Sequence, residues 1–128
     1  MCGICGFYSN RKETIDNLTE MNSTLIHRGP DDCGEEIYDV SDGYSVGLAH
    51  RRLAIVDLSL LAHQPMHSVN RDISLVFNGE IYNYKDLREE LSIEYPFNSY
   101  SDTEVIIAAY LKWGKELVHY LNGMFAIA

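Results

Sequence analysis

The residue types near the start of the chain offer one candidate nucleophile. If Met1 is removed, as the small side chain at position 2 favours, Cys2 carries both a thiol and the α-amine of the chain. A free α-amine has a reference pKa of about 7.7–8.0, so a useful fraction of it accepts protons near neutral pH. The two groups would then combine a nucleophile and its general base in one residue. Position alone favours an ordinary cysteine near a chain end, so the other polar residues must decide.

Cys2 and Cys5 also form a Cys-x-x-Cys pair, a spacing that is typical of zinc sites and redox dithiols. A zinc site needs two more closely spaced ligands, and neither Cys33 nor the five scattered histidines supply such a pair. A redox pair normally opens a helix, whereas Gly3 and Ile4 lie in an expected strand. We therefore expect no metal site. Three cysteines without an export signal also predict no disulfide framework.

Further along the chain, three polar positions offer binding groups, each with an ordinary structural explanation. Asn78-Gly79 most often forms a hairpin turn, but it can also supply an oxyanion site from one side-chain amide and one backbone N–H. His50-Arg51-Arg52 lies at the end of an expected strand, where each arginine is most often a surface residue, but one of the two can bind a substrate carboxylate bidentately. Asp102 lies in the first turn of an expected helix, where it either stabilises the helix dipole or receives an ammonium group.

The elements that would position these residues follow from hydrophobic periodicity and turn signals. Strands are expected at 3–8, 36–40, 44–49, 73–77 and 124–128, with Asp42-Gly43 joining the second and third as a hairpin. The three- and four-residue spacing of Ile15, Leu18, Met21 and Leu25 predicts one amphipathic helix, which ends before Arg28. Residues 53–58 form another apolar stretch, followed by an irregular segment to about residue 70.

Two more helices are expected in the second half of the chain. Asn83 is a candidate N-cap for a helix over residues 84–91. Ser101 and Glu104 fit the capping-box pattern at the start of the next helix, which Gly114 ends. The face of that helix expected to point inward consists of Val105, Ile106, Ala109, Tyr110 and Trp113.

Composition and charge narrow the class of protein. A chain of 128 residues suits one domain with one core, and its mixture of short strands and few helices predicts an α+β fold built on antiparallel sheets. The net charge of −9 disfavours nucleic acid and anionic membranes as partners. Because no apolar run approaches a span and no signal-peptide pattern is present, we expect a cytoplasmic protein. An apolar, strand-like end at 124–128 predicts that the chain is a fragment of a longer protein.

The order and length of seven sequence blocks resemble the glutamine-hydrolysing asparagine synthetase family. These blocks are Met1-Cys2-Gly3-Ile4, His27-Arg28-Gly29-Pro30-Asp31-Asp32, His50-Arg51-Arg52-Leu53-Ala54-Ile55-Val56-Asp57, His63-Gln64-Pro65-Met66, Phe77-Asn78-Gly79-Glu80-Ile81-Tyr82-Asn83, Ser101-Asp102-Thr103-Glu104 and Gly123-Met124-Phe125-Ala126. The resemblance implies a class II glutamine amidotransferase domain over residues 1–128, C-terminally incomplete. It also implies the N-terminal-nucleophile hydrolase fold, a four-layer αββα sandwich with antiparallel sheets. Cys33 and Ala62 depart from the family's commoner residues at positions outside the chemistry.

The resemblance also assigns a role to each candidate residue. Cys2 would attack the side-chain amide of L-glutamine, with its α-amine transferring the proton, to form a glutamate thioester and release ammonia. Asn78 and Gly79 would stabilise the oxyanion. The residues that would bind the glutamine are Arg52 at the α-carboxylate, the backbones of Leu53, Ile55 and Val56, the oxyanion pair Asn78 and Gly79, and Glu80 and Asp102 at the α-amine.

The family's second half implies the remaining partners. An absent synthetase domain would bind ATP, Mg²⁺ and aspartate and use the ammonia to make asparagine. No Ser-Gly-Gly-type loop occurs in this chain, so we expect it to bind no cofactor itself. A homodimer is compatible with the sequence.

Three alternatives remain. The first is a sugar-phosphate or phosphoribosyl amidotransferase, which the Arg-Leu-x-Ile-Val-Asp and Asn-Gly-Glu-Ile-Tyr-Asn blocks disfavour. The second is an asparagine synthetase-like enzyme that amidates another carboxylate. The third is a non-catalytic regulatory or interaction domain of the same fold.

Overall fold

The computed structural model describes residues 2–11 and 13–128, so the prediction that Met1 is removed lies outside the described residues. The helices are α1 (Ile15–Ser23), α2 (Tyr84–Leu91) and α3 (Asp102–Trp113), with 3₁₀ turns at Ser41–Gly43, Leu60–Ala62 and Gly114–His119. The strands are β1 (Gly3–Ser9), β2 (Asp32–Asp39), β3 (Ser45–Arg52), β4 (Met66–His67), β5 (Ser74–Leu75), β6 (Phe77–Ile81) and β7 (Gly123–Ile127). All strand pairs are antiparallel, which confirms the α+β prediction.

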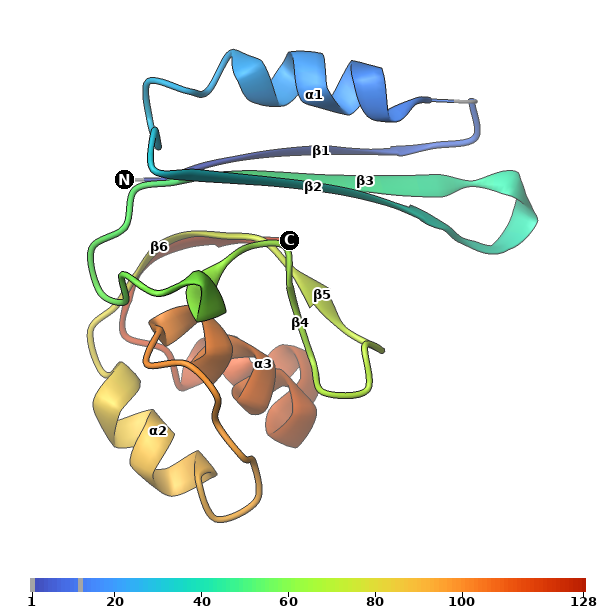
Figure 1. Cartoon of the computed structure of the whole chain (residues 1–128). Coiled ribbons are helices and arrows are strands. Elements are labelled where there is room, and N and C mark those ends of the chain that lie inside the picture. The colour runs from blue at the N-terminus through green and yellow to red at the C-terminus, as the bar shows by residue number, and fades with distance from the viewer. Residues whose placement is uncertain (1, 12) are drawn as a thin grey trace.

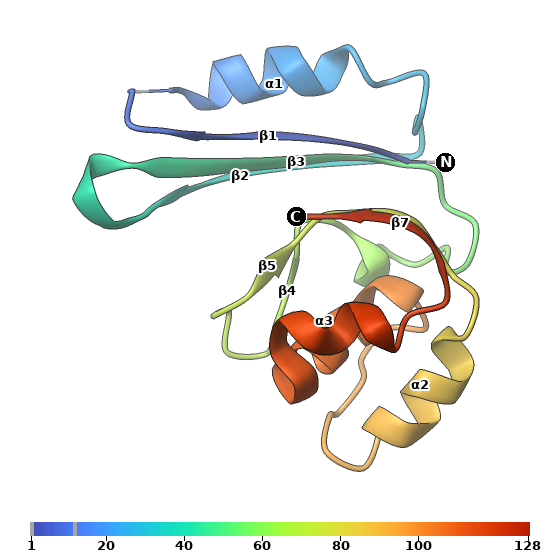
Figure 2. The same cartoon turned by 180° about the vertical axis from the view of Figure 1, so that it is seen from behind.

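The elements lie in successive layers (Figure 1). Helix α1 covers one face of a three-stranded sheet of order β1-β3-β2. The opposite face of that sheet is turned towards the β6-β7 and β4-β5 pairs, and helices α2 and α3 lie beyond these (Figure 2). None of the helices in the described ranges is long and apolar enough to cross a membrane.

The register of the three-stranded sheet brings distant segments to one end of it. Gly3 pairs with Arg51, and Asp32 pairs with Arg52, so the beginnings of β1 and β2 flank the end of β3. The pairing of β2 and β3 continues to Asp39 and Ser45, which confirms the predicted hairpin. As a consequence, Cys2 lies beside the residues that follow β3.

The main hydrophobic core belongs to the second half of the chain. Its buried members are Met66, Leu75, Phe77, Ile81, Leu87, Leu91, Tyr95, Val105, Ile106, Ile107, Ala108, Ala109 and Leu117. Helix α3 packs on α2 and on the β6-β7 side of the fold, and its first eight residues are all buried. The predicted inward face of α3 is confirmed except for Tyr110, which is 42% exposed.

Helix α1, which the sequence predicted, contacts the sheet through few apolar side chains. Leu18 is fully buried, but Ile15 and Met21 are exposed, and Leu25 lies beyond the end of the helix. The contact with the sheet is partly polar instead. The buried Asn22 side chain donates through Nδ2 to Glu35 Oε1 at 2.8 Å. The predicted helix is therefore present, and it is held on the sheet by a hydrogen bond as well as by Leu18.

The strand predicted at residues 73–77 is divided, and Asn78-Gly79 is not a turn. Ser74 and Leu75 pair with β4, whereas β6 begins at Phe77 and continues to Ile81. Asn78-Gly79 therefore lies inside β6, paired with β7. A side chain at position 79 would overlap the Met124 carbonyl, so glycine is required there for a close approach of two strands.

The helix ends follow the predictions in part. Ser101 Oγ accepts a hydrogen bond from Glu104 N at 3.3 Å, as an N-cap should. The reciprocal half of the capping box is absent, because the Glu104 carboxylate accepts from the backbone N–H groups of Asn98 and Ser99. Gly114 ends α3 with φ of +57°. Asn83 precedes α2 without capping it.

Asn83 instead joins two distant segments. Its Nδ2 donates to Tyr120 O at 2.9 Å, and its Oδ1 accepts from Asn122 N at 2.9 Å. The predicted helix is therefore present, but the Asn83 side chain bonds the segment at residues 120–122 instead of capping the helix.

Candidate active site

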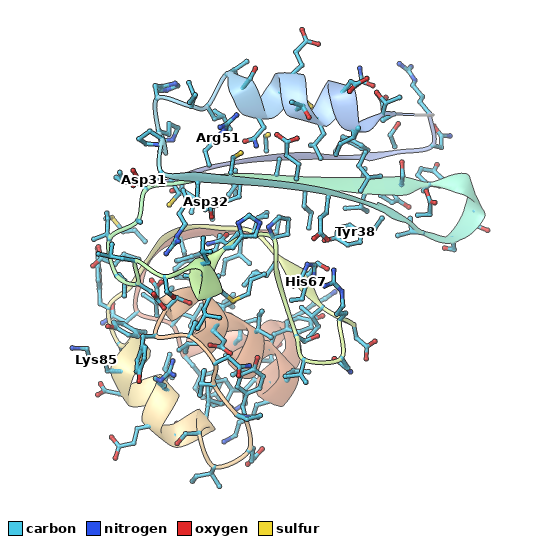
Figure 3. All side chains as sticks on the ribbon, in the orientation of Figure 1. Asp31, Asp32, Tyr38, Arg51, His67 and Lys85 are labelled. Carbon is cyan, nitrogen blue, oxygen red and sulfur yellow. The ribbon has the colours of Figure 1, made fainter. Side chains whose placement is uncertain are left out.

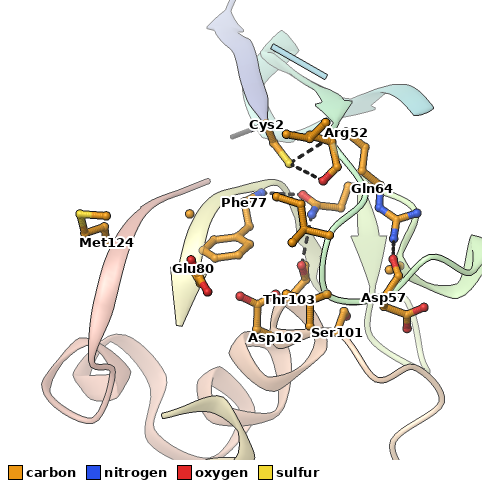
Figure 4. A pocket seen from close by; sticks show the side chains of 15 residues that line it. Cys2, Arg52, Asp57, Gln64, Phe77, Glu80, Ser101, Asp102, Thr103 and Met124 are labelled. Atoms are coloured by element: carbon orange, nitrogen blue, oxygen red, sulfur yellow. Dashed lines mark hydrogen bonds between the residues drawn. The ribbon is translucent and has the colours of Figure 1, made fainter. Parts of the chain in front are cut away.

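A cavity of about 180 Å³ lies where the end of β3, residues 53–57, β6 and the start of α3 meet. It is lined by Cys2, Arg52, Leu53, Ile55, Val56, Asp57, Ala62, Gln64, Phe77, Gly79, Glu80, Ser101, Asp102, Thr103 and Met124 (Figure 4). Eight of the nine residues proposed from the sequence are therefore brought together, and Asn78 is the exception.

Cys2 is placed by two segments that the three-stranded sheet holds close to it. Its Sγ lies 3.4 Å from Leu53 N, which donates to it, and 3.7 Å from Leu53 O. The carbonyl of Cys2 accepts a hydrogen bond from Arg28 Nε at 2.9 Å. The thiol is half-buried and lies at the cavity wall, where a bound molecule can reach it.

Arg52 supplies a buried positive charge, with only 7% of its surface exposed. Nη1 donates to Ser59 O at 3.0 Å, and Nη2 donates to Asp57 O. A guanidinium has five N–H donors, so three remain for another partner. Within residues 2–11 and 13–128, no carboxylate forms a salt bridge with Arg52. A buried cation without an anionic partner is suited to an anionic ligand.

The segment after β3 is held in place by the Asp57 carboxylate. It accepts hydrogen bonds from Ser59 N at 2.8 Å and from Tyr100 N at 2.9 Å. Burial raises the pKa of Asp57, but these hydrogen bonds, together with the charge of Arg52, outweigh it and lower the pKa below its ordinary value. Residues 53–57 are thus joined to the segment that leads into α3.

Strand β6 turns one row of N–H groups towards the cavity. Its ladder with β7 uses the alternate residues, since Val76 exchanges hydrogen bonds with Ala128 and Tyr82 N donates to Asn122 O. The N–H groups of Phe77, Gly79 and Ile81 therefore point away from β7.

The first and third of these N–H groups donate hydrogen bonds to side chains. Phe77 N donates to Gln64 Oε1 at 2.7 Å, and Ile81 N donates to Asp102 Oδ2 at 3.1 Å. The Gly79 N–H lies between them, at the wall of the cavity. It is therefore placed to donate to an oxygen atom of a bound molecule.

Asn78 does not line the cavity, although its neighbours Gly79 and Glu80 do. Its Oδ1 is buried without a hydrogen-bond partner in the described part of the chain. Of the two oxyanion donors proposed from the sequence, the structure brings only the Gly79 backbone to the cavity wall.

Asp102 supplies a buried carboxyl group on the opposite side of the cavity from the end of β3 (Figure 4). Burial raises its pKa, backbone N–H groups of Ile81, Thr103 and Asp102 itself lower it, and the negative charge of Glu80 raises it; the net shift is upward. Glu80 is exposed at the mouth. The ionised form of Asp102 would gain from a bound cation.

Several lining residues were not singled out from the sequence. Asp57, Gln64, Ser101 and Thr103 all lie in the blocks quoted above, next to residues with assigned roles. That adjacency was the available signal. It does not reveal that Gln64 is 4% exposed with both ends of its amide bonded, because the surrounding segment has no periodic pattern.

Family comparison agrees with this site. A family model described as a glutamine amidotransferase domain matches residues 1–128, and the chain belongs to that family. It is similar to asparagine synthetases named as glutamine-hydrolysing, with 40% identity to number 1 of Bacillus subtilis and 43% to number 3 of Arabidopsis thaliana. It is also 36% identical to a protein of Gibberella zeae named amidase chry2. Each match covers 98% of this chain but only 20%, 21% and 20% of the respective relative.

Proposed function

We propose that this chain hydrolyses the side-chain amide of L-glutamine to glutamate and ammonia, with Cys2 as the nucleophile. The observation that carries the proposal is the grouping of a thiol, an unpaired buried cation, an outward N–H and a buried carboxyl around one small cavity. Cys2, Arg52, Gly79 and Asp102 provide these four groups.

The charges at the cavity suit a zwitterionic amino acid. The three unused N–H donors of Arg52 can bind the α-carboxylate, and a bidentate contact would fix its orientation. Asp102, with the exposed Glu80 beside it, can receive the α-ammonium group. The backbones of Leu53, Ile55 and Val56 would line the same pocket.

The proposed reaction begins with the proton of the Cys2 thiol. After removal of Met1, the α-amine of Cys2 accepts that proton, and Sγ attacks the side-chain carbonyl carbon of glutamine. Negative charge develops on the carbonyl oxygen, where the Gly79 N–H and the Asn78 amide stabilise it. The protonated α-amine of Cys2 then donates the proton to the leaving nitrogen of the amide, and ammonia departs.

Water completes the cycle. The glutamate thioester on Cys2 is attacked by a water molecule whose proton the α-amine accepts, and glutamate leaves as Sγ regains a proton. The Asn78 amide must turn towards Cys2 for its part, and its oxygen has no hydrogen bond to break.

We further propose that residues 1–128 form part of an N-terminal-nucleophile hydrolase sandwich that supplies ammonia to a synthetase domain. The layer order of helix, sheet, sheet and helices supports that fold. The matched relatives are named asparagine synthetases, which supports asparagine as the product and hence aspartate as the acceptor. The use of ATP and Mg²⁺ by the synthetase domain is what the family resemblance implies. The match to a protein named as an amidase keeps another carboxylate acceptor as the alternative.

Intact mass spectrometry with an electrophilic glutamine analogue tests the nucleophile. We expect one adduct on the protein that has lost Met1, none on Cys2→Ala, and no glutaminase activity in Cys2→Ala or Cys2→Ser despite an unchanged fold. Cys5→Ala is the matched control, and it should keep the adduct, because burial, with the negative charge of Glu35, raises the pKa of the Cys5 thiol and makes it less reactive. Persistent hydrolysis by Cys2→Ala would rule the mechanism out.

The same mass-spectrometry experiment also tests the alternative that the domain is not catalytic. Protein that has lost Met1, is folded and binds no analogue would support a regulatory or interaction role. An adduct confined to Cys2 would exclude that alternative.

A further inference from the structure

We propose that Gln64 is a positioning residue for glutamine hydrolysis, an inference that rests on the function proposed above. Its side chain is 4% exposed and lines the cavity, and both ends of its amide are bonded (Figure 4). Oε1 accepts from Phe77 N at 2.7 Å, and Nε2 donates to Thr103 Oγ1 at 3.2 Å. The side chain therefore joins β6 to the start of α3.

The two bonds end next to residues of the proposed chemistry. Phe77 N is the first of the outward N–H groups of β6, and the Gly79 N–H is the next one along the strand. Thr103 follows Asp102 directly. Gln64 thus connects the strand that would stabilise the oxyanion with the helix end that would bind the ammonium group.

A second bond lies on the other side of Gly79. Ile81 N donates to Asp102 Oδ2, so β6 is tied to the start of α3 at two points, one before and one after the Gly79 N–H. Loss of the Gln64 bonds would leave the Ile81 contact as a pivot. The Gly79 N–H could then move relative to Cys2 while Arg52 and Asp102 still hold the substrate.

The consequence is specific to the transition state. A donor aimed at a developing oxyanion contributes little to binding of the ground state, and a misplacement of about 1 Å can cost about 100-fold in rate. Removing the Gln64 bonds should therefore lower kcat and leave KM nearly unchanged. A residue that contacted the substrate directly would change KM as well.

Steady-state glutaminase kinetics on the protein at its natural length test the inference. Gln64→Met keeps the volume without the hydrogen bonds, and we expect kcat to fall about 10- to 100-fold with KM within about 3-fold. Thr103→Val should lower kcat in the same direction, and Thr103→Ser, which keeps the hydroxyl, should restore it. The double variant Gln64→Met/Thr103→Val should be no slower than Gln64→Met alone, because both changes remove one connection.

Leu91→Ala is the stability control, since Leu91 is a core residue of α2 outside the cavity. It should lower Tm and leave kcat unchanged below its unfolding transition, which separates positioning from a general loss of stability. An active wild type with unchanged kcat in Gln64→Met would overturn this inference alone, as would a rise in KM without a fall in kcat. A wild type without glutaminase activity would overturn the proposed function and this inference together.

Discussion

The two sides of the cavity are stabilised in different ways. Residues 2–11 and 13–52 include the long hydrogen-bonded ladders under α1, and their fully buried side chains include the polar Asn22 and His50. Residues 66–127 pack a continuous apolar core between β6 and helices α2 and α3. The thiol and the cation come from the first region, and the carboxyl and the outward N–H come from the second. The geometry of the site therefore depends on contacts between two differently built regions.

Several of those contacts are hydrogen bonds. His50 Nε2 donates to Phe77 O at 3.1 Å, and His67 Nε2 lies 3.0 Å from Glu36 Oε1. Tyr38 and His67 are directed into the space between the layers (Figure 3), where Tyr38 donates to the same Glu36 carboxylate. Because hydrogen bonds need defined geometry, these contacts fix the position of one region relative to the other.

The largest expected effect is on the free energy of unfolding, when one buried leucine from each region is replaced by alanine. Leu91→Ala should lower the free energy of unfolding by about 3–5 kcal/mol, because its apolar neighbours leave a cavity. Leu18→Ala, although equally buried, should cost nearer to about 2 kcal/mol, because polar contacts also hold α1 on its sheet. Urea unfolding of both variants measures the difference. A larger loss for Leu18→Ala would contradict the contrast between the two regions.

A pH dependence follows from His50, which joins the regions. Burial lowers its pKa to about 4, with Arg52 and His63 acting in the same direction, while its bond to Phe77 O and the charge of Asp32 act in the opposite one. Because the folded pKa lies below the unfolded value of about 6.5, the stabilisation is complete above pH 6.5 and is lost as pH falls towards 4.

His50→Gln, which keeps an N–H donor without titrating, isolates this contribution. From pH 7 to pH 4 the wild type should lose about 3 kcal/mol more unfolding free energy than the variant does. Urea unfolding across that range measures the difference. Parallel curves for the two proteins would show that His50 is not the group responsible.

The negative charge of Asp102, in the second region, can be removed while its hydrogen bond from Ile81 N is kept. Asp102→Asn keeps an oxygen for Ile81 N but loses the negative charge proposed to bind the α-ammonium. We expect KM for glutamine to rise at least about 30-fold, which corresponds to about 2 kcal/mol. The matched control Glu80→Gln should have a smaller effect, because Glu80 is exposed and its charge is screened.

Although Asp102→Asn should weaken glutamine binding, it should increase the stability of the fold at pH 7. Burial raises the folded pKa of Asp102, so the ionised carboxylate destabilises the fold above that pKa and ceases to do so as pH falls. The variant should therefore be more stable than the wild type at pH 7, and the gain should disappear in acid. A loss of stability at pH 7 would mean that Asp102 has a structural role that asparagine cannot replace.

The elements, more than their contacts, could be predicted from the sequence. The helices at residues 84–91 and after Ser101 were correctly placed, because periodicity and the Ser101 cap are local signals. Asn78-Gly79 misled, because an isolated dipeptide favours a turn, whereas β7 supplies a ladder partner from more than 40 residues away. Local propensity has no information about that partner.

The candidate site shows the same division. The resemblance named eight residues that do line the cavity, since short blocks preserve residue types. Gln64 and Asp57 were not assigned roles, because their importance lies in bonds to Phe77, Thr103 and Tyr100, far along the chain. Such bonds follow only from the three-dimensional arrangement.

The smallest expected effect concerns Asp57, which joins residues 53–57 to the second region. Asp57→Asn keeps one acceptor and loses the other, so the unfolding free energy at pH 7 should fall by about 1 kcal/mol. Because hydrogen bonds hold its folded pKa low, the difference should vanish as pH falls through that pKa. A looser pocket wall should raise KM for glutamine a few-fold with kcat unchanged. Asp39→Asn, exposed at the far end of β2, should change neither quantity, and an equal loss there would assign the effect to surface charge instead.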